Sequence, residues 1–252
     1  MDYTDKEMMA ITAGRMVSDG DVLFAGTGLS MLAAAVAKRI HARNSIVFFE
    51  TGGIDPSLDE LPLAVADPRV MTGAAVNSGL IDAFSILGHR KIRSLAFLGA
   101  AQIDPFGNLN STVIGEYRHP KARLPGSGGA ADAAGLAHGF IVFMQHEKRR
   151  FVEKLDYFTS PGWLSGGDSR RRAGFPRGGP LAVTTNLGIL KFEEISKRMY
   201  LAEFYPGSTP EKIADNTGFD LDISRAVEAA PPTREELTIL RCEVDPQRLI
   251  LK

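Results

Sequence analysis

The sequence contains a single cysteine, Cys242, among its 252 residues. One thiol excludes an intramolecular disulfide and any metal cluster built from several cysteines. No two of the five histidines are spaced as in H-x-x-x-H, so we expect no metal site. The Gly-x-Ser-x-Gly pattern of many serine hydrolases is also missing. The sequence therefore offers little support for metal or serine-hydrolase chemistry.

Net charge and long apolar runs are equally scarce. A formal charge of -1 gives no general attraction to nucleic acid or to anionic membranes, and we expect neither partner. No apolar run approaches the roughly 20 residues that a membrane helix needs. Residues 1–12 lack the basic stretch and apolar core of an export signal. Together with the lone thiol, these absences predict a cytoplasmic protein.

Short apolar segments alternate with helical periodicities along the chain, which predicts an open, largely parallel α/β sheet flanked by helices. Thr4 and Glu7 form a capping-box pattern before the first helix. Residues 181–205 are β-rich, and residues 1–252 are assigned to one domain with a C-terminal extension from about 181 to 252. The expected strands are 21–26, 45–50, 93–99 and 139–144, and the expected helices are 4–17, 29–41, 210–216 and a final helix capped by Thr233.

Ligands in such folds bind at the carboxyl ends of the strands. Three motifs follow expected strands there, at 26–28, 50–53 and 99–104, and we expect them to face one crevice. Glu50 ends an apolar strand and precedes Thr51, Gly52 and Gly53. Glycines after a carboxylate give a substrate room to approach. A plain acidic residue that begins a turn explains the pattern equally well, and this alternative stays open.

Two further segments have polar or glycine-rich character. Gln102 and the asparagines after it supply hydrogen-bond donors to a ligand or tie down a turn, and the pattern slightly favours the turn. The loop from Pro125 to Asp132 has the composition of an oxyanion nest, although a flexible linker is the alternative. The basic stretches 146–150 and 170–172 are typical of phosphate sites, but solvated surface is favoured for most of them.

The order of these motifs and the residues within them resemble those of one family over nearly the whole chain. The matching segments include Ala101-Gln-Ile-Asp-Pro105, Gly126-Ser-Gly-Gly-Ala130, Met144-Gln-His-Glu-Lys-Arg-Arg-Phe151, Thr159-Ser-Pro-Gly-Trp163 and Asn216-Thr-Gly-Phe-Asp-Leu-Asp222. With these segments the chain resembles the β subunits of glutaconate CoA-transferases, within the family I CoA-transferases. Their fold is an open α/β sheet of the NagB/RpiA-like type.

The resemblance implies a nucleophilic glutamate, which falls on Glu50. Family members form an acyl-glutamyl anhydride and then a glutamyl-CoA thioester, and so exchange CoA by a ping-pong route. A homologous α subunit completes them, so we expect a higher hetero-oligomer. Coenzyme A is a substrate, for example as acetyl-CoA or glutaconyl-CoA, and no other cofactor is expected. The residues implied in binding CoA or the oxyanion are Gln102, Gly126, Gly128, Gly129 and Ala130.

Relatives with the same fold perform other reactions. A decarboxylase branch carries cysteine at the nucleophile position, and steroid ring-opening hydrolases lack the glutamate. Glutamate at position 50 therefore favours the transferase over an acyl-CoA decarboxylase or a hydrolase. A non-catalytic scaffold subunit is the remaining alternative. The segments 52–57 and 71–78, which include Asn77, differ from the glutaconate enzyme and are expected to shape the acyl pocket.

Overall fold

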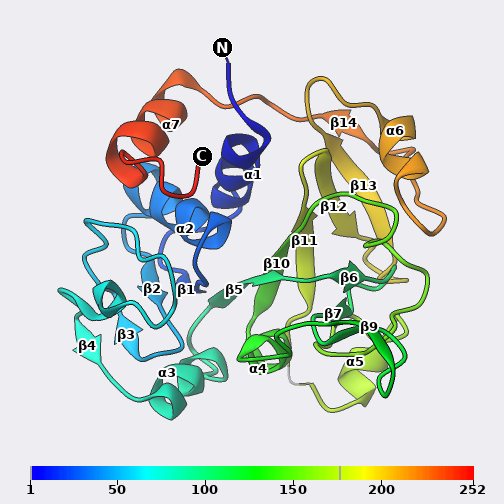
Figure 1. The fold of residues 1–252 in the computed structure, drawn as a ribbon, viewed down its shortest axis with the longest axis horizontal. Helices are drawn as coiled ribbons and strands as arrows, with labels where there is room; N and C mark the ends of the chain where they lie inside the picture. Colours follow the sequence, from blue (N-terminus) through cyan, green and yellow to red (C-terminus); the bar gives the residue numbers. More distant parts are fainter. Residues whose placement is uncertain (1, 176) are drawn as a thin grey trace. The chain divides into compact units, whose positions relative to one another are not determined.

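The computed structural model describes residues 2–175 and 177–252, and the chain divides into two compact units (Figure 1). The first unit contains the chain up to Leu98 together with Pro231–Lys252, and the second contains Gly99–Ala230. Residues 181–230 thus belong to the second unit, while the last 22 residues belong to the first. The assignment to a single domain stays a prediction.

The sheet of the first unit has the strand order β5-β1-β2-β3-β4. β1 pairs in parallel with β2 and with β5, whereas β3 pairs antiparallel with β2 and with β4. The strands are β1 (Val22–Phe24), β2 (Ile46–Phe48), β3 (Gly53–Ile54), β4 (Val76–Asn77) and β5 (Ser94–Gly99). The buried β1 and most of β2 and β5 form the apolar centre, as expected for strands covered by helices.

Two helices of the first unit begin at capping boxes, whereas α2 and α3 begin at Gly28 and Gly79 without a side-chain cap. The Thr4 capping box with Glu7 is present, and a second box joins Thr233 to Glu236. Arg241 donates two hydrogen bonds to the Glu7 carboxylate, at 2.6 and 2.9 Å, and holds its pKa below the ordinary value. This ion pair ties the C-terminal segment to α1. The helices are α1 (Asp5–Gly14), α2 (Leu29–Ile40), η1 (Pro68–Met71), α3 (Leu80–Leu87), α7 (Arg234–Ile239) and η2 (Leu240–Val244).

The sheet of the second unit has the order β14-β13-β12-β11-β10. β10 and β11 are parallel, as are β13 and β14, while the pairs β11–β12 and β12–β13 are antiparallel. The strands are β10 (Gly139–Phe143), β11 (Pro180–Thr184), β12 (Gly188–Phe192), β13 (Met199–Phe204) and β14 (Val227–Glu228). The predicted open α/β sheet is confirmed, with antiparallel strands added beside the parallel ones.

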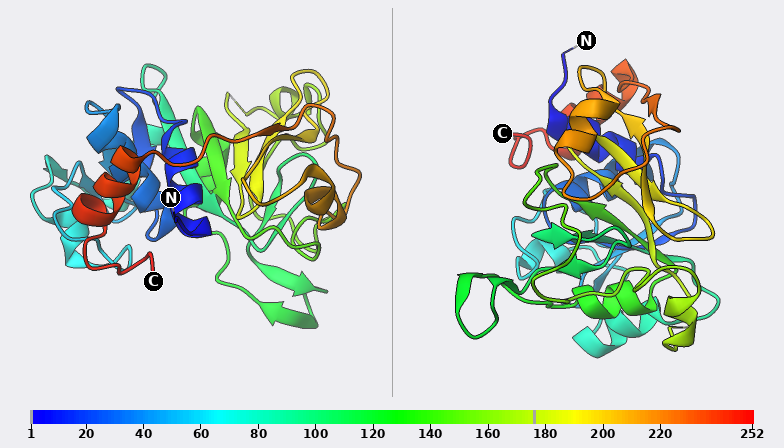
Figure 2. Two further views of the ribbon diagram at one scale, coloured as in Figure 1. Left: turned by 90° about the horizontal axis from the view of Figure 1, so that it is seen from above. Right: turned by 90° about the vertical axis from the view of Figure 1, so that its right-hand side faces the viewer.

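Smaller elements surround this second sheet. β6 pairs with β7, and β8 with β9; the β8–β9 hairpin stands out from its unit in both views of Figure 2. No helix in the described ranges is long and apolar enough to cross a membrane. The elements are β6 (Gln102–Ile103), β7 (Leu109–Asn110), β8 (Val113–Gly115), β9 (Pro120–Arg123), α4 (Ala130–Leu136), α5 (Ser169–Arg172) and α6 (Pro210–Asp215).

His146, which belongs to a stretch expected to be largely solvated, is only 4% exposed. Its ring stacks on Phe151 with centroids 4.1 Å apart. Nε2 lies 3.0 Å from the Thr217 hydroxyl, which itself donates to the Ile213 carbonyl, so the imidazole donates this bond. Burial lowers the pKa of His146 to about 4. The imidazole is therefore neutral at physiological pH and packs as a core aromatic residue.

This burial predicts a loss of stability in mild acid. The unfolded chain binds a proton at His146 near pH 6.5, and the folded chain binds it only near pH 4, so stability falls as the pH drops between these values. Between pH 7.5 and 5 the wild-type chain is expected to lose about 2 kcal/mol more than a His146→Gln variant. Urea unfolding of both chains at the two pH values measures this difference. Equal losses would show that His146 titrates normally in the folded chain.

Candidate active site

Glu50 lies in a tight turn that follows β2. The N–H of Gly52 donates to the Phe49 carbonyl at 3.0 Å, and the N–H of Phe49 donates to the Gly53 carbonyl at 3.0 Å. Glu50 and Thr51 are thus the two central residues of a four-residue turn. Phe49 is fully buried, Glu50 is partly buried and Thr51 is exposed. The chain therefore passes from the apolar sheet to the surface within two residues, with the carboxylate at the transition.

The Glu50 carboxylate forms no hydrogen bond or ion pair with any residue of the ranges 2–175 and 177–252. The register of β1 and β2 pairs Phe24 with Phe48, so the residues after both strands emerge at the same sheet edge. The 26–28 motif therefore accompanies Glu50, as predicted, and leads into α2. A partly buried carboxylate whose oxygens are not engaged is suited to act as a nucleophile.

Gly52 and Gly53 are required by the fold of the chain itself. A Cβ on Gly52 would lie 1.9 Å from the Ser78 carbonyl oxygen, and one on Gly53 would lie 2.0 Å from the Val70 carbonyl oxygen. Gly52 also has φ +108°, a conformation that L side chains rarely adopt. The sequence predicts that these glycines make room for a substrate. The structure shows instead that the space beside them is filled by backbone from the 70–79 segment.

The remaining predicted residues of this group lie beside the same turn. Asn77 is exposed and pairs with Gly53 in the β3–β4 ladder. Thr51 donates from its hydroxyl to the Val65 carbonyl at 3.0 Å, so it anchors the turn rather than remaining free. Glu50, Thr51, Gly52, Gly53 and Asn77 thus all lie in the first unit, and their role in shaping a substrate pocket stays a prediction.

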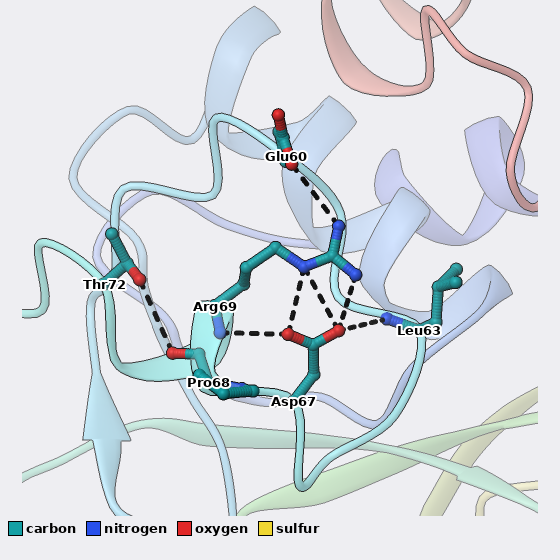
Figure 3. Close-up of polar contacts among 6 residues, drawn as sticks. All are labelled: Glu60, Leu63, Asp67, Pro68, Arg69 and Thr72. Carbon is teal, nitrogen blue, oxygen red and sulfur yellow. Dashed lines mark hydrogen bonds and ion pairs between the residues drawn. The ribbon is translucent and has the colours of Figure 1, made fainter.

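A cavity of about 260 Å³ opens between the segments 57–60 and 69–72, which follow this turn. The Arg69 guanidinium lies 2.6 Å from the Asp67 carboxylate and 3.5 Å from that of Glu60. Figure 3 shows it between these two acidic side chains. Arg69 holds the pKa of Asp67 well below its usual range. Because Asp59 and Glu60 also line the cavity, its charge does not favour a carboxylate ligand.

Gln102 is 5% exposed and lies in a polar network of the second unit. Its carbonyl oxygen accepts from the Asn110 amide at 2.7 Å and from the Asp156 N–H at 3.1 Å, while its own amide donates to the Asp156 carboxylate. The Asp156 carboxylate also accepts from the N–H of Gly115. These contacts fit the turn-fixing alternative for Gln102. Its role as a donor to an oxyanion stays a prediction.

The glycine-rich loop from 126 to 130 is anchored at its two ends. Gly126 exchanges two hydrogen bonds of 2.9 Å with Ser111, one donated by the Gly126 N–H and one by the Ser111 hydroxyl. The carbonyl of Ser127 accepts from Ala130, and its hydroxyl accepts from Ala131 at the start of α4. Neither the N–H of Gly128 nor that of Gly129 has a hydrogen-bond partner among the described residues. The tip of the loop therefore presents two adjacent free donors, as a nest requires.

Sequence reasoning missed Asp156 and Ser127, which hold the polar network and the loop. Asp156 is 54 positions from Gln102, and no local pattern marks such a pairing. Ser127 lies two residues before Gly129, the N-cap of α4, so no capping pattern marks it. The described residues contain no group of three or more potential metal ligands.

Comparison with known proteins places these residues in context. The family model described as Coenzyme A transferase matches residues 6–216. The chain is 46% identical to the β subunit of the glutaconate CoA-transferase of Acidaminococcus fermentans, over 99% of this chain and 96% of that protein. It is 39% identical to the β subunit of the 3-oxoadipate CoA-transferase of Pseudomonas knackmussii, over 95% and 92%. The crystal structure of the A. fermentans glutaconate coenzyme A-transferase superimposes with a TM-score of 0.96, covering 100% of this chain and 98% of that one at 45% identity.

The contacts of Gly52 predict that alanine is not tolerated there. Gly52→Ala forces a Cβ against the Ser78 carbonyl at a positive φ, so the first unit is expected to lose at least about 2 kcal/mol of unfolding free energy. Gly26→Ala is the matched control, since its Cβ would meet no atom within 4 Å. Urea denaturation of both variants tests this. Similar stability of the two variants would contradict the steric argument.

Proposed function

The chain belongs to the coenzyme A transferase family, and on this premise we propose that it moves CoA between an acyl-CoA and a carboxylic acid through a thioester on Glu50. The unengaged carboxylate of Glu50, in a tight turn that directly follows β2, is the observation that supports this best. The decarboxylase branch carries cysteine at the position of Glu50, and the hydrolases lack the glutamate. A scaffold subunit would have no need of a free carboxylate there.

The reaction consists of four transfers. The Glu50 carboxylate attacks the acyl-CoA carbonyl and expels CoA thiolate, which leaves an acyl-glutamyl anhydride. The thiolate attacks the glutamyl carbonyl and releases the free acid, which leaves glutamyl-CoA. The second acid then attacks the glutamyl-CoA carbonyl and expels the thiolate again. Finally the thiolate attacks the new acyl carbonyl, and Glu50 is regenerated as a carboxylate.

The difficulty of these four reaction steps is thermodynamic, because a carboxylate displaces the more basic thiolate to form an anhydride. An ordinary glutamate is already ionised at neutral pH, so no general base is required. Binding energy from the remote parts of CoA offsets the cost of the anhydride. Water must also be excluded while the anhydride exists.

Among the loop residues, Gly128 and Gly129 are the best candidates for stabilising the tetrahedral oxyanion. The N–H of Gly126 is used by Ser111, and that of Ala130 by Ser127. The amides of Gly128 and Gly129 have no hydrogen-bond partner among the described residues and can donate to an anion. We assign Gln102 to holding the base of the loop through Asn110, which neighbours Ser111.

Substrates and partners are proposed from the relatives. Both transferases carry the names of dicarboxylic acids, and we propose a dicarboxylic acid as the substrate of this chain as well. Both relatives are also β subunits of heteromeric enzymes, so a homologous α subunit is implied as the partner. We further propose a higher hetero-oligomer that works in the cytoplasm with coenzyme A as substrate and with no other cofactor.

Replacing Glu50 tests the chemistry directly. In the complex with the α subunit, Glu50→Gln is expected to lower CoA exchange at least about a thousandfold, since the nucleophile is removed. Incubation of the wild-type complex with acyl-CoA alone is expected to leave CoA on the peptide that contains Glu50, as measured by mass spectrometry. Glu228→Gln, an exposed glutamate of β14, is the matched control and should retain exchange.

The two measurements also separate the alternatives. Full exchange by Glu50→Gln, or an adduct on another peptide, would rule out Glu50 as the nucleophile. Absence of both exchange and adduct in the wild-type complex, over a panel of dicarboxylic acids, would favour a scaffold role.

A further inference from the structure

A second pocket, of about 290 Å³, lies within the second unit and is lined by cations and aromatic rings. It is formed by the 160–180 region and by the turn between β12 and β13. Its walls include Trp163, Arg170, Arg171, Phe175, Arg177 and Lys197. The sequence favours solvated surface for most of the 170–172 stretch, but the structure places two of these arginines at a concave site.

Arg170 forms the floor of this pocket and is only 3% exposed. Its guanidinium donates to backbone carbonyls, and its face lies 4.7 Å from the centroid of Phe175. Burial lowers the pKa of Arg170 to about 10, so the group remains charged at neutral pH. The accepting carbonyls are those of Ala134, Gly135, Pro161, Gly162 and Arg177.

The wall of the pocket combines a cation with an indole platform. The indole of Trp163 is fixed by a hydrogen bond from Nε1 to the Pro180 carbonyl at 3.2 Å. Lys197 is held at φ +61° with its ammonium 4.6 Å from the ring centroid. Lys197 forms no ion pair with any residue of the described ranges. A lysine in a left-handed conformation is held by its surroundings and not by its own preference.

The charges of the pocket do not cancel. Asp168 is the acidic residue of its lining, against Arg170, Arg171, Arg177 and Lys197. Asp168 is also shared, because its carboxylate lies 2.8 Å from Arg172, outside the lining, and 3.8 Å from Arg171. Cations gathered around one concavity repel each other unless an anion joins them. Lys197 already lies over one face of the Trp163 ring and Arg170 over one face of the Phe175 ring, so a base can stack only on the opposite face of either ring.

α4 connects this pocket to the glycine-rich loop. The loop leads into the first residue of α4, and the other end of the helix accepts from Arg170 and lies against Phe175. Seven helical residues span about 10 Å, so the pocket and the loop lie at opposite ends of one short helix. In coenzyme A the pantetheine arm likewise separates the thioester from the phosphates and the adenine.

We propose that the pocket lined by Trp163, Arg171 and Lys197 binds the nucleotide end of CoA, a 3′-phosphorylated adenosine diphosphate. Its cations neutralise the phosphates, and its indole or phenyl ring supports the adenine. This assignment rests on the proposed function for its choice of ligand, while the pocket itself requires only a phosphorylated adenosine.

The test measures binding of adenosine 3′,5′-bisphosphate to the complex with the α subunit by calorimetry. This probe has neither thiol nor acyl group, so its binding does not depend on Glu50 chemistry. Lys197→Met and Arg171→Gln are each expected to weaken binding about tenfold, because each removes one cation from the phosphates. Arg149→Gln, which removes an exposed arginine of the same unit, is the control and should change binding less than about twofold.

The outcomes distinguish the ligand from its alternatives. Unchanged binding in both pocket variants, or no binding to the wild type, would overturn the proposal. Inorganic phosphate that displaces the probe at equal concentration would replace the nucleotide assignment with a simple anion site. In turnover, the KM for acyl-CoA should rise in the pocket variants while the KM for the acid stays constant. Probe binding that is lost in the variants of a complex without CoA exchange would support the pocket and reject the proposed function.

Discussion

The position of Glu50 depends on two backbone contacts that admit no side chain. The carbonyls of Ser78 and Val70 occupy the places where Gly52 and Gly53 would carry a Cβ. β4 and the 65–72 segment contact this turn from two sides. A shift of Glu50 and Thr51 would therefore disturb the ladder between β3 and β4. The backbone of Glu50 is thus constrained by the turn, while its carboxylate oxygens form no hydrogen bond with the described residues.

In the glycine-rich loop, too, the backbone is fixed at both ends while the polar groups between them stay unengaged. Its base is fixed by Ser111, and its far end by the hydrogen bonds that Ser127 accepts from Ala130 and Ala131, whereas the amides of Gly128 and Gly129 have no partner among the described residues. α4 is in turn held at its C-terminal carbonyls by Arg170. A cation at the C-terminus of a helix is favourable because the carbonyls there carry partial negative charge. Each end of the loop–helix segment is thus fixed, and the two free N–H groups are the part left for a ligand.

Local sequence patterns predict the elements that local physics determines. Thr4 and Thr233 are capping residues whose partners lie three positions away, and both boxes are present. The position of Glu50 at a strand end is predictable for the same reason. The role of its glycines is not, since the Ser78 and Val70 carbonyls arrive from segments about 20 residues away. Burial of Arg170 escapes prediction because three adjacent arginines are typical of surface, and only the fold shows which one points inward. Gln102 likewise depends on Asp156, 54 residues distant.

Arg170 also explains why the basic pocket keeps its charge. A buried guanidinium is commonly paired with a carboxylate, which would cancel its field. Here dipoles of backbone carbonyls satisfy the donors, and carbonyls carry no net charge. The hydrogen bonds are therefore complete while the positive charge remains available to a ligand at the mouth of the pocket. The field is strongest where water is partly excluded, so phosphates gain more there than on the open surface beside Arg172. The same carbonyls end α4, so Arg170 joins the pocket to the helix that begins at the loop. In the proposed site, α4 therefore links the pocket for the remote end of CoA to the loop that presents the Gly128 and Gly129 amides. A transferase that uses remote binding energy at the reacting carbonyl requires such a link.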